Sequence, residues 1–240
     1  MEASFALTPI GRIRTPYGQK FAVPRQPGLA PAACEIELFK PYCDPQAVVG
    51  LEGFSHIHVI FVFDQEPESA QFRPMVRPPR LGGNQRVGVF ACRSPNRPNR
   101  LGLSVLKLTG IENRAGRSVL HVEGADMVDN TPIVDIKPYI PFVDAIPEAQ
   151  GGFALTPPPQ KQVVFSPAAE QQLATDPTLA HVRAQRELLA RILAQDPRPA
   201  YKLKEQDAKD YAALIMGVNV RFSVSADTVT VLRLEPGPAA

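Results

Sequence analysis

The sequence predicts a mainly β N-terminal region followed by a small α+β unit. The first 150 residues contain several short hydrophobic runs of strand length, each bounded by Gly, Pro or Asn. The chain also has 26 prolines and no tryptophan, a composition that interrupts long helices. Many short strands joined by turns are typical of a barrel or a sandwich. A long run with helical periodicity occurs only after residue 160.

Five segments of the N-terminal region fit strands by length and composition. They are Cys34 to Phe39, Ser55 to Phe63, Arg86 to Ala91, Leu103 to Ile111 and Ser118 to Gly124. The segment from Asn113 to Gly116 lies between the last two and supplies the Gly that a tight hairpin needs at positive φ. Asp44 and Pro45 supply a cap and a first-turn proline for one short helix over Ala47 to Leu51.

The hydrophobic runs stop between Phe142 and Lys161. Gly151-Gly152 and Pro157-Pro158-Pro159 in this segment cannot continue a helix or an interior strand. We therefore expect an N-terminal domain over residues 1–150 and a C-terminal domain over residues 160–240.

The C-terminal part changes from strand patterns to helical ones. Ser166-Pro167 opens a short helix, and a longer helix is predicted from Thr178 to Gln195. The apolar face of this helix carries Leu179, Val182, Leu189, Ile192 and Leu193. Two strand-like runs, Leu214 to Val224 and Thr228 to Leu234, follow it.

Charge and cysteine content restrict the class of protein. Lys and Arg number 26 against 24 Asp and Glu, so the formal net charge of +2 does not by itself require a polyanionic partner. Cys34, Cys43 and Cys92 follow no metal-ligand spacing and come without a secretory leader, which predicts a reducing cytoplasm. No apolar run reaches the roughly 20 residues that span a bilayer. We expect no membrane insertion and no metal.

Positive charge is concentrated in one segment, residues 69–111, which contains no Asp or Glu. Its basic residues are Arg73, Arg77, Arg80, Arg86, Arg93, Arg97, Arg100 and Lys107. Because arginine offers a planar fork of donors to phosphate oxygens, this stretch fits a loop-borne surface for nucleic acid. The alternative is a solvated basic loop that pairs with acids elsewhere in the fold.

Two other segments carry polar side chains that suit chemistry. Asp126, Asp129 and Asp135 could hydrogen-bond an adenosine or accept a proton, although Asp129-Asn130 also fits a turn. His56 and His58 face the same side of one predicted strand, but no third ligand lies at a zinc-like spacing, so we expect a structural or pocket-lining role.

The sequence contains neither a Rossmann-type dinucleotide fingerprint nor a Walker-type Gly-Lys-Thr loop. The segment from Gly82 to Gly88 is not a Gly-x-Gly-x-x-Gly motif and no strand-helix alternation follows it. An adenosine cofactor would therefore bind on a scaffold other than the Rossmann fold. Cys92 has no identifiable partner base, so we interpret it as a small packing residue.

Several motifs in order along the chain resemble the TrmO (TsaA-like) family of tRNA (adenine-37 N6)-methyltransferases, in its bacterial two-domain type. They are the segments 21–28 (FAVPRQPG), 53–56 (GFSH), 77–84 (RPPRLGGN), 93–95 (RSP), 97–99 (RPN), 131–139 (TPIVDIKPY) and 196–201 (DPRPAY). The resemblance implies a single-sheet β-barrel, S-adenosylmethionine as methyl donor and a homodimer. It also implies methylation of N6 of threonylcarbamoyladenosine at position 37 of a threonine tRNA.

The resemblance also implies site residues. The cofactor cleft is expected to be lined by Arg25, Gln26, Pro27, Asp64, Gln65, Arg93, Leu103, Ala125, Asp126 and Met127. The expected contacts to tRNA are Arg77, Arg80, Arg86, Arg97, Asn99, Arg100, Lys137 and Tyr139. The exocyclic nitrogen is a poor nucleophile, so a carboxylate that accepts its hydrogen bond would help, and Asp135 is the candidate.

The chain departs from the family pattern at a few positions. Asp64 stands where His is often found, His58 where Trp is often found, and Arg100 replaces a usual Pro and could add a phosphate contact. Two other functions stay open. One is a non-catalytic RNA-binding or regulatory module on the same barrel, and the other is a methyltransferase for a small metabolite.

Overall fold

The computed structural model describes residues 5–67, 71–81, 83–199, 202 and 209–238. Ser69, Ala70 and Gly82 of the basic stretch, and residues 200 and 201 of the C-terminal motif, lie outside the described residues.

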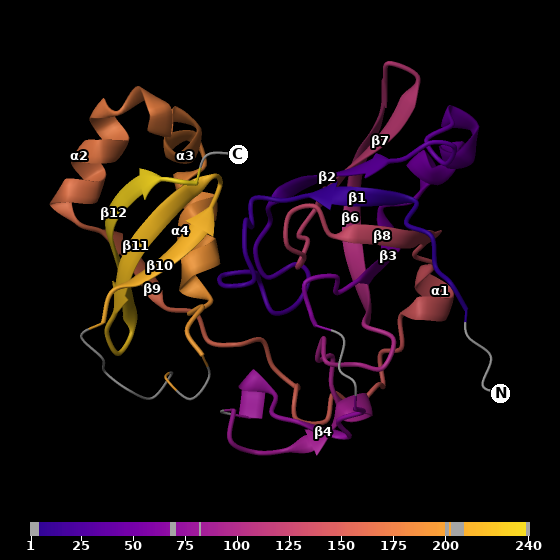
Figure 1. Ribbon diagram of the computed structural model, residues 1–240, viewed down its shortest axis with the longest axis horizontal. Helices are drawn as coiled ribbons and strands as arrows, with labels where there is room; N and C mark the ends of the chain where they lie inside the picture. The colour runs from indigo at the N-terminus through magenta and orange to yellow at the C-terminus, as the bar shows by residue number, and fades with distance from the viewer. Residues whose placement is uncertain (1–4, 68–70, 82, 200–201, 203–208, 239–240) are drawn as a thin grey trace.

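Six antiparallel strands form a closed barrel (Figure 1). In order around the barrel these are β1 (Gly11–Arg14), β2 (Ala33–Leu38), β7 (Arg117–Glu123), β6 (Leu101–Arg114), β3 (His56–Val62) and β8 (Pro132–Pro138). Closure leaves no free sheet edge in this part of the fold. The expected single-sheet barrel is therefore confirmed.

Strand β3 shows how the barrel core is built. Ile57, Val59 and Phe61 are buried, whereas His56 and His58 between them are half-buried on the outer face, as the alternation predicts. The Phe61 ring lies over Gly102 of β6, and a Cβ added at Gly102 would lie 2.2 Å from the Cζ atom of that ring. Only glycine fits this position without moving the core.

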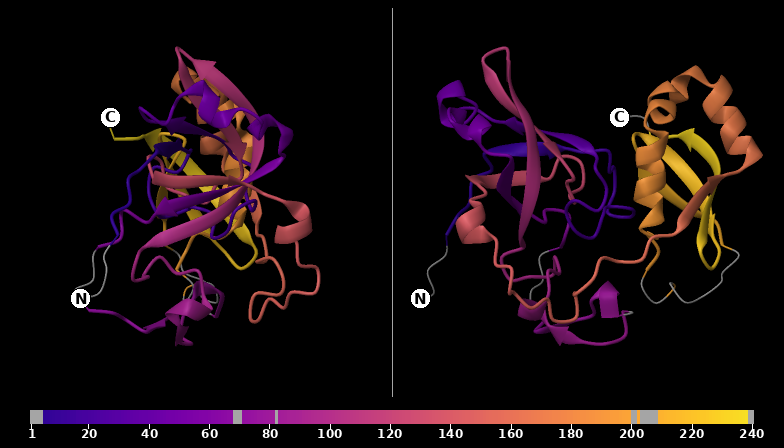
Figure 2. Two further views of the ribbon diagram at one scale, coloured as in Figure 1. Left: turned by 90° about the vertical axis from the view of Figure 1, so that its right-hand side faces the viewer. Right: turned by 180° about the vertical axis from the view of Figure 1, so that it is seen from behind.

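The C-terminal unit, residues 162–236, is a four-stranded sheet with helices packed against it (Figure 2). The sheet order is β10 (Tyr211–Ile215), β11 (Val218–Val224), β12 (Thr228–Pro236) and β9 (Gln162–Phe165). The helices are α2 (Pro167–Thr175), α3 (Ala180–Ala184) and α4 (Arg186–Ala194), with the 3-10 turn η5 (Pro177–Leu179) before α3. This arrangement confirms the expected small α+β unit.

Between β3 and β6 the chain leaves the barrel and forms a projecting ribbon that we call the flap, residues 71–81 and 83–92 (Figure 1, magenta). It contains β4 (Met75–Val76), η3 (Pro79–Leu81), β5 (Val87–Gly88) and η4 (Val89–Ala91). The remaining elements are η1 (Pro45–Val48), η2 (Leu51–Gly53) and α1 (Pro141–Asp144).

Several predicted elements have different boundaries. The strand over Arg86 to Ala91 is wrong, because β5 pairs only with the two residues of β4 before η4 begins. The helix over Ala47 to Leu51 is instead the 3-10 turn η1, in which Asp44 caps Gln46 and a left-handed Gly50 follows. Strand β8 forms within a segment that the sequence indicated only as a turn with candidate site residues.

Two predicted elements of the C-terminal unit are divided. The helix over Thr178 to Gln195 breaks at Gln185, whose φ of −113° is not helical, although its apolar face is buried as expected. The strand over Leu214 to Val224 is a hairpin, because Met216 and Gly217 adopt positive φ and reverse the chain. The hairpin expected over Asn113 to Gly116 is confirmed, with Gly116 at a φ of 78°.

A loop of the barrel joins the two units. The amide of Gly18 donates to the carbonyl of Leu214 at 3.2 Å, and the amide of Met216 donates to the carbonyl of Pro16 at 2.7 Å, so this segment extends the edge strand β10. The ring of Phe21 stacks with the rings of Tyr211 and Phe222, at centroid distances of 6.3 and 6.2 Å. The loop after β1 is thus held from both sides.

Candidate functional site

Ser104 and Asp126 meet at the point where β7 ends. The register of β6 and β7 pairs Lys107 with Glu123, and its continuation by three residues brings Asp126 opposite Ser104. Ser104 is buried, and its hydroxyl donates to Oδ1 of Asp126 at 2.6 Å. The strand pairing therefore fixes a carboxylate at the rim of the barrel interior.

Arg93 and Gln26 complete this site, which we call the Arg93–Asp126 corner (Gln26, Arg93, Ser104 and Asp126). Nη1 of Arg93 donates to Oε1 of Gln26 at 2.8 Å. The positive charge of Arg93 is close enough to lower the pKa of Asp126, as does the hydrogen bond from Ser104. Burial acts in the opposite direction and dominates, so the pKa of Asp126 is raised to about 6.

Tyr17 and Cys34 lie next to the corner, although the sequence indicated no role for either side chain there. Burial raises the pKa of Tyr17, and the charge of Asp126 contributes to that shift. The Tyr17 hydroxyl is buried and, among the described residues, has no hydrogen-bond partner. Burial also raises the pKa of Cys34 to about 12, so its thiol is not a nucleophile at neutral pH. No sequence motif marks either residue, because the fold alone brings Tyr17 close to Asp126 and Cys34 close to Tyr17.

Arg97 organises the loop that carries Arg93. Its Nη1 atom donates to the carbonyl of Cys92 at 2.8 Å and reaches the carbonyls of Val89 and Ser94 at 3.5 Å each. The expected phosphate contact thus belongs to a side chain that already holds the loop backbone. Arg100 is similar, because it donates to the carbonyl of Glu66 at 2.8 Å.

The other residues expected in the cofactor cleft fall into two groups. Ala125 and Met127 are buried on either side of Asp126, and Pro27 follows Gln26. Asp64 and Gln65 follow the end of β3, where the Gln65 carbonyl accepts from Nζ of Lys20 at 2.7 Å. These residues lie on the segments that form or flank the corner.

Arg25 and Leu103 are directed elsewhere. The guanidinium of Arg25 donates to the carbonyl of Arg198 at 2.9 Å, in the C-terminal unit, and lines a cavity of about 390 Å³ between the two units. Leu103 is 56% exposed on the outer face of β6, because Ser104 beside it points inward. Neither side chain is directed at Asp126 in this structure.

Asp135, the expected proton acceptor, lies on the outside of the barrel. It forms an ion pair with Lys137 at 3.1 Å and accepts from the amide of Ile136 at 2.9 Å. Its register partner Ile60 also pairs with Leu103, so Asp135 and Leu103 share one row of the outer face. Tyr139, another expected tRNA contact, has its ring centroid 5.4 Å from that of His58.

Two of the expected tRNA contacts on the flap, Arg77 and Arg86, are exposed. Arg77 and Arg86 project into solvent, and Asn99 is exposed in the loop before β6. Arg80 lies in η3. Within the described part of the chain, neither Arg77 nor Arg86 forms an ion pair with an acid. The alternative of a basic loop neutralised by acids elsewhere therefore does not describe these two side chains.

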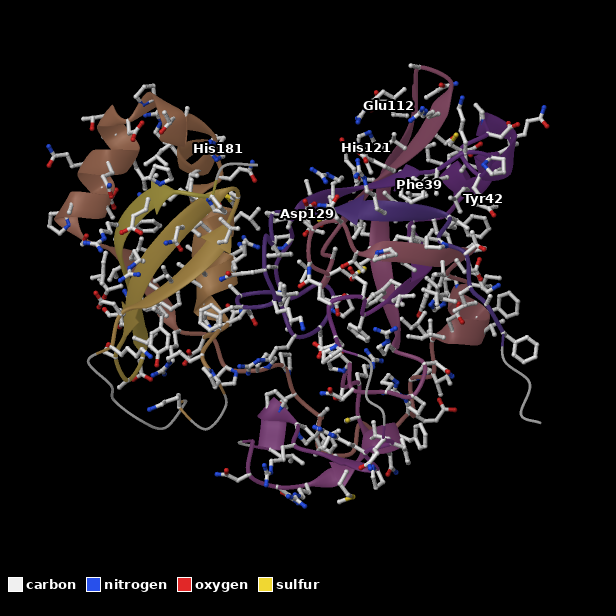
Figure 3. All side chains as sticks on the ribbon, in the orientation of Figure 1. Phe39, Tyr42, Glu112, His121, Asp129 and His181 are labelled. Atoms are coloured by element: carbon white, nitrogen blue, oxygen red, sulfur yellow. The ribbon has the colours of Figure 1, made fainter. Side chains whose placement is uncertain are left out.

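A second cluster of charges lies on the β6–β7 hairpin, where Figure 3 shows Glu112 and His121. Arg114 donates to both Glu35 and Glu112, which holds the pKa of Glu35 below its usual range. A cavity of about 580 Å³ lies beside it, lined by residues that include Arg14, Glu35, His121 and Asp129. Among the described residues, no group of three or more His, Cys, Asp or Glu could hold a metal.

Comparison with known proteins identifies the family. The model of the tRNA-methyltransferase O N-terminal domain matches residues 12–145, and that of the TrmO C-terminal domain matches residues 158–237. This chain belongs to the tRNA-methyltransferase O family. The matches include every residue of the Arg93–Asp126 corner.

Two curated relatives and a solved structure match almost the whole chain. The tRNA (adenine(37)-N6)-methyltransferase of Escherichia coli (strain K12) is 46% identical over 237 residues, 98% of this chain and 99% of that protein. A Pseudomonas aeruginosa protein, whose name assigns it to the S-adenosylmethionine-dependent methyltransferases, is 44% identical and covers 90% of this chain and 91% of its own. A crystal structure of TrmO from the same organism superposes with a TM-score of 0.77 at 36% identity, and covers 99% of both chains.

Among the described residues, no helix is long and apolar enough to cross a bilayer.

Proposed function

We propose that this chain transfers a methyl group from S-adenosylmethionine to N6 of adenosine 37 in the anticodon loop of tRNA. The observation that supports this most is the Arg93–Asp126 corner, which lies within the matched N-terminal family domain. The finer proposal is that the adenosine carries a threonylcarbamoyl group and belongs to threonine tRNA, in the cytoplasm.

The residues of the corner fit the chemistry of this cofactor. S-adenosylmethionine carries a carboxylate, an ammonium group and ribose hydroxyls, and it supplies an electrophilic methyl group when bound. The guanidinium of Arg93 can pair with the carboxylate of the cofactor. The carboxylate of Asp126 can accept a hydrogen bond from the cofactor's ammonium group or from a ribose hydroxyl. Pro27, Asp64, Gln65, Ala125 and Met127 remain the proposed neighbours of the cofactor, while Arg25 and Leu103 require another placement to reach it.

Methylation of N6 also requires a proton acceptor, because the nitrogen loses a proton when its new bond to carbon forms. Asp126 suits this role better than Asp135. Its pKa of about 6 leaves it ionised at neutral pH yet more basic than an ordinary aspartate, which favours proton acceptance. Asp135 is instead exposed and held by Lys137.

The remaining parts of the proposal concern tRNA and assembly. The exposed side chains of Arg77, Arg86 and Asn99 would contact the phosphate backbone of the anticodon stem-loop. The bases in the loop are unpaired and are therefore accessible to the protein. We also propose that the protein is a homodimer with domains over residues 1–150 and 160–240.

Incubation of the protein with labelled methyl donor and total tRNA, followed by nucleoside analysis, tests this function. The proposal expects label on N6 of the adenosine at position 37. Binding of tRNA without consumption of the methyl donor would instead support the non-catalytic RNA-binding module. Turnover that does not depend on tRNA would support the small-metabolite enzyme.

A further inference from the structure

The flap carries two phenylalanine rings in an unusual setting. Phe72 and Phe90 are 59% and 73% exposed, and their rings stack on each other with centroids 6.2 Å apart and planes 25° apart. Large apolar side chains that stack on each other at the surface can mark a binding site, especially where polar or charged residues surround them.

The backbone of the flap holds this pair in place. The ribbon pairs Met75 with Gly88, and the amide of Val89 donates to the carbonyl of Pro74 at 2.9 Å. Val89 is buried, whereas Phe90 next to it points outward. Arg97 then ties the following loop through the carbonyls of Val89 and Cys92. The exposed rings are thus presented by a hydrogen-bonded frame.

The charges around the rings define the chemistry of a partner. Arg73, Arg77 and Arg86 are exposed on the same flap, and no Asp or Glu occurs between residues 69 and 111. Within the described ranges, none of these three arginines is in an ion pair. An exposed aromatic surface flanked by unneutralised arginines is the combination that binds single-stranded nucleic acid, because bases stack on the rings while the cations hold phosphates.

We propose that Phe72 and Phe90 form a stacking platform for an unpaired base of the tRNA substrate. The proposal rests on the proposed function and assigns an RNA-binding role to two residues outside the Arg93–Asp126 corner. Phe90 lies three residues before Arg93, whose guanidinium contacts Gln26. A base on the platform would therefore bind where the flap leads into the corner, and would anchor the loop that presents the target adenosine.

A single-tryptophan variant tests stacking directly, because the chain contains no tryptophan. In Phe90→Trp, tryptophan emission should be quenched when a synthetic anticodon stem-loop binds, since the indole then stacks on a base. A blunt-ended RNA duplex of equal length, which has no unpaired base, should leave the emission unchanged. The matched control is Phe142→Trp, in which the new side chain replaces a phenylalanine that is 89% exposed on α1. Equal quenching at both positions, or none at Phe90→Trp while the RNA binds, would overturn the platform.

Affinity gives a second readout. The double variant Phe72→Ala with Phe90→Ala should bind the anticodon stem-loop about five- to hundredfold more weakly, whereas Phe72→Tyr with Phe90→Tyr should keep the affinity and Phe142→Ala should not change it. Unchanged affinity of the double alanine variant, with wild-type methylation of tRNA intact, refutes the platform and leaves the proposed function standing. A wild-type protein that neither binds nor methylates tRNA refutes the proposed function itself.

Discussion

The Arg93–Asp126 corner and the flap use arginine in opposite ways. In the corner, Arg93 is fixed to Gln26 and its charge acts on a buried carboxylate. In the flap, Arg77 and Arg86 are exposed, and no ion pair fixes them within the described residues. From this contrast we propose a division of work in which the Arg93–Asp126 corner takes part in methyl transfer and the flap holds the substrate. Substitutions in either region change one side of this contrast.

The largest expected effect comes from Asp126→Asn, which keeps the size of the side chain but removes the proton acceptor. We expect the turnover number for tRNA methylation to fall about 100-fold or more. The matched control is Asp135→Asn on the outer face, which should retain activity. If Asp135→Asn lost most of its turnover while Asp126→Asn stayed active, Asp135 and not Asp126 would be the proton acceptor.

A pair of glycines compares the packing of the two regions. Gly102→Ala places a Cβ against the Phe61 ring beneath the corner, so we expect a loss of about 1–3 kcal/mol in the free energy of unfolding. Gly88→Ala in the flap meets no atom within 4 Å and has a φ of −59°, so its effect should lie within about 1 kcal/mol of zero. Urea denaturation measures the free energy of unfolding of both variants. Equal losses of this free energy would contradict the difference in packing between the two positions.

The pH dependence of activity should identify Asp126. Because its pKa is raised to about 6, the carboxylate form that accepts a proton is lost as the pH falls through 6, so kcat/KM should decline on that side and level off above it. The Ser104 hydrogen bond lowers this pKa, hence Ser104→Ala should move the midpoint to higher pH. A midpoint that stays in place in Ser104→Ala would show that another group titrates.

The smallest expected effect is on the salt dependence of tRNA binding. Each phosphate contact releases counterions, so the double variant Arg77→Ala with Arg86→Ala should reduce the slope of log K against log salt by about two. Arg93→Ala should change this slope less, because its guanidinium is engaged within the corner. Binding constants at several salt concentrations measure both slopes, and equal slopes in wild type and double variant would remove the phosphate role of the flap.

The sequence predicts the strands of the barrel better than its site. Alternation in β3 indicates which residues are buried, and Asn-Arg-Ala-Gly indicates the β6–β7 hairpin, because both signals are local. Gln26, Arg93 and Asp126 are brought together by strand register and loop contacts between segments far apart, so only the family resemblance indicated that they share one site. The same resemblance could not show that Arg25 turns to the C-terminal unit or that Leu103 and Ser104 face opposite ways.

Steady-state kinetics of two variants with tRNA test the division of work most directly. Arg93→Ala should lose methyl transfer while its dissociation constant for tRNA stays near that of the wild type. The double variant Phe72→Ala with Phe90→Ala should instead raise KM for tRNA and keep kcat at saturating tRNA. An Arg93→Ala protein that methylates at the wild-type rate, or a flap variant that loses kcat with KM unchanged, would contradict the separation of chemistry from substrate binding.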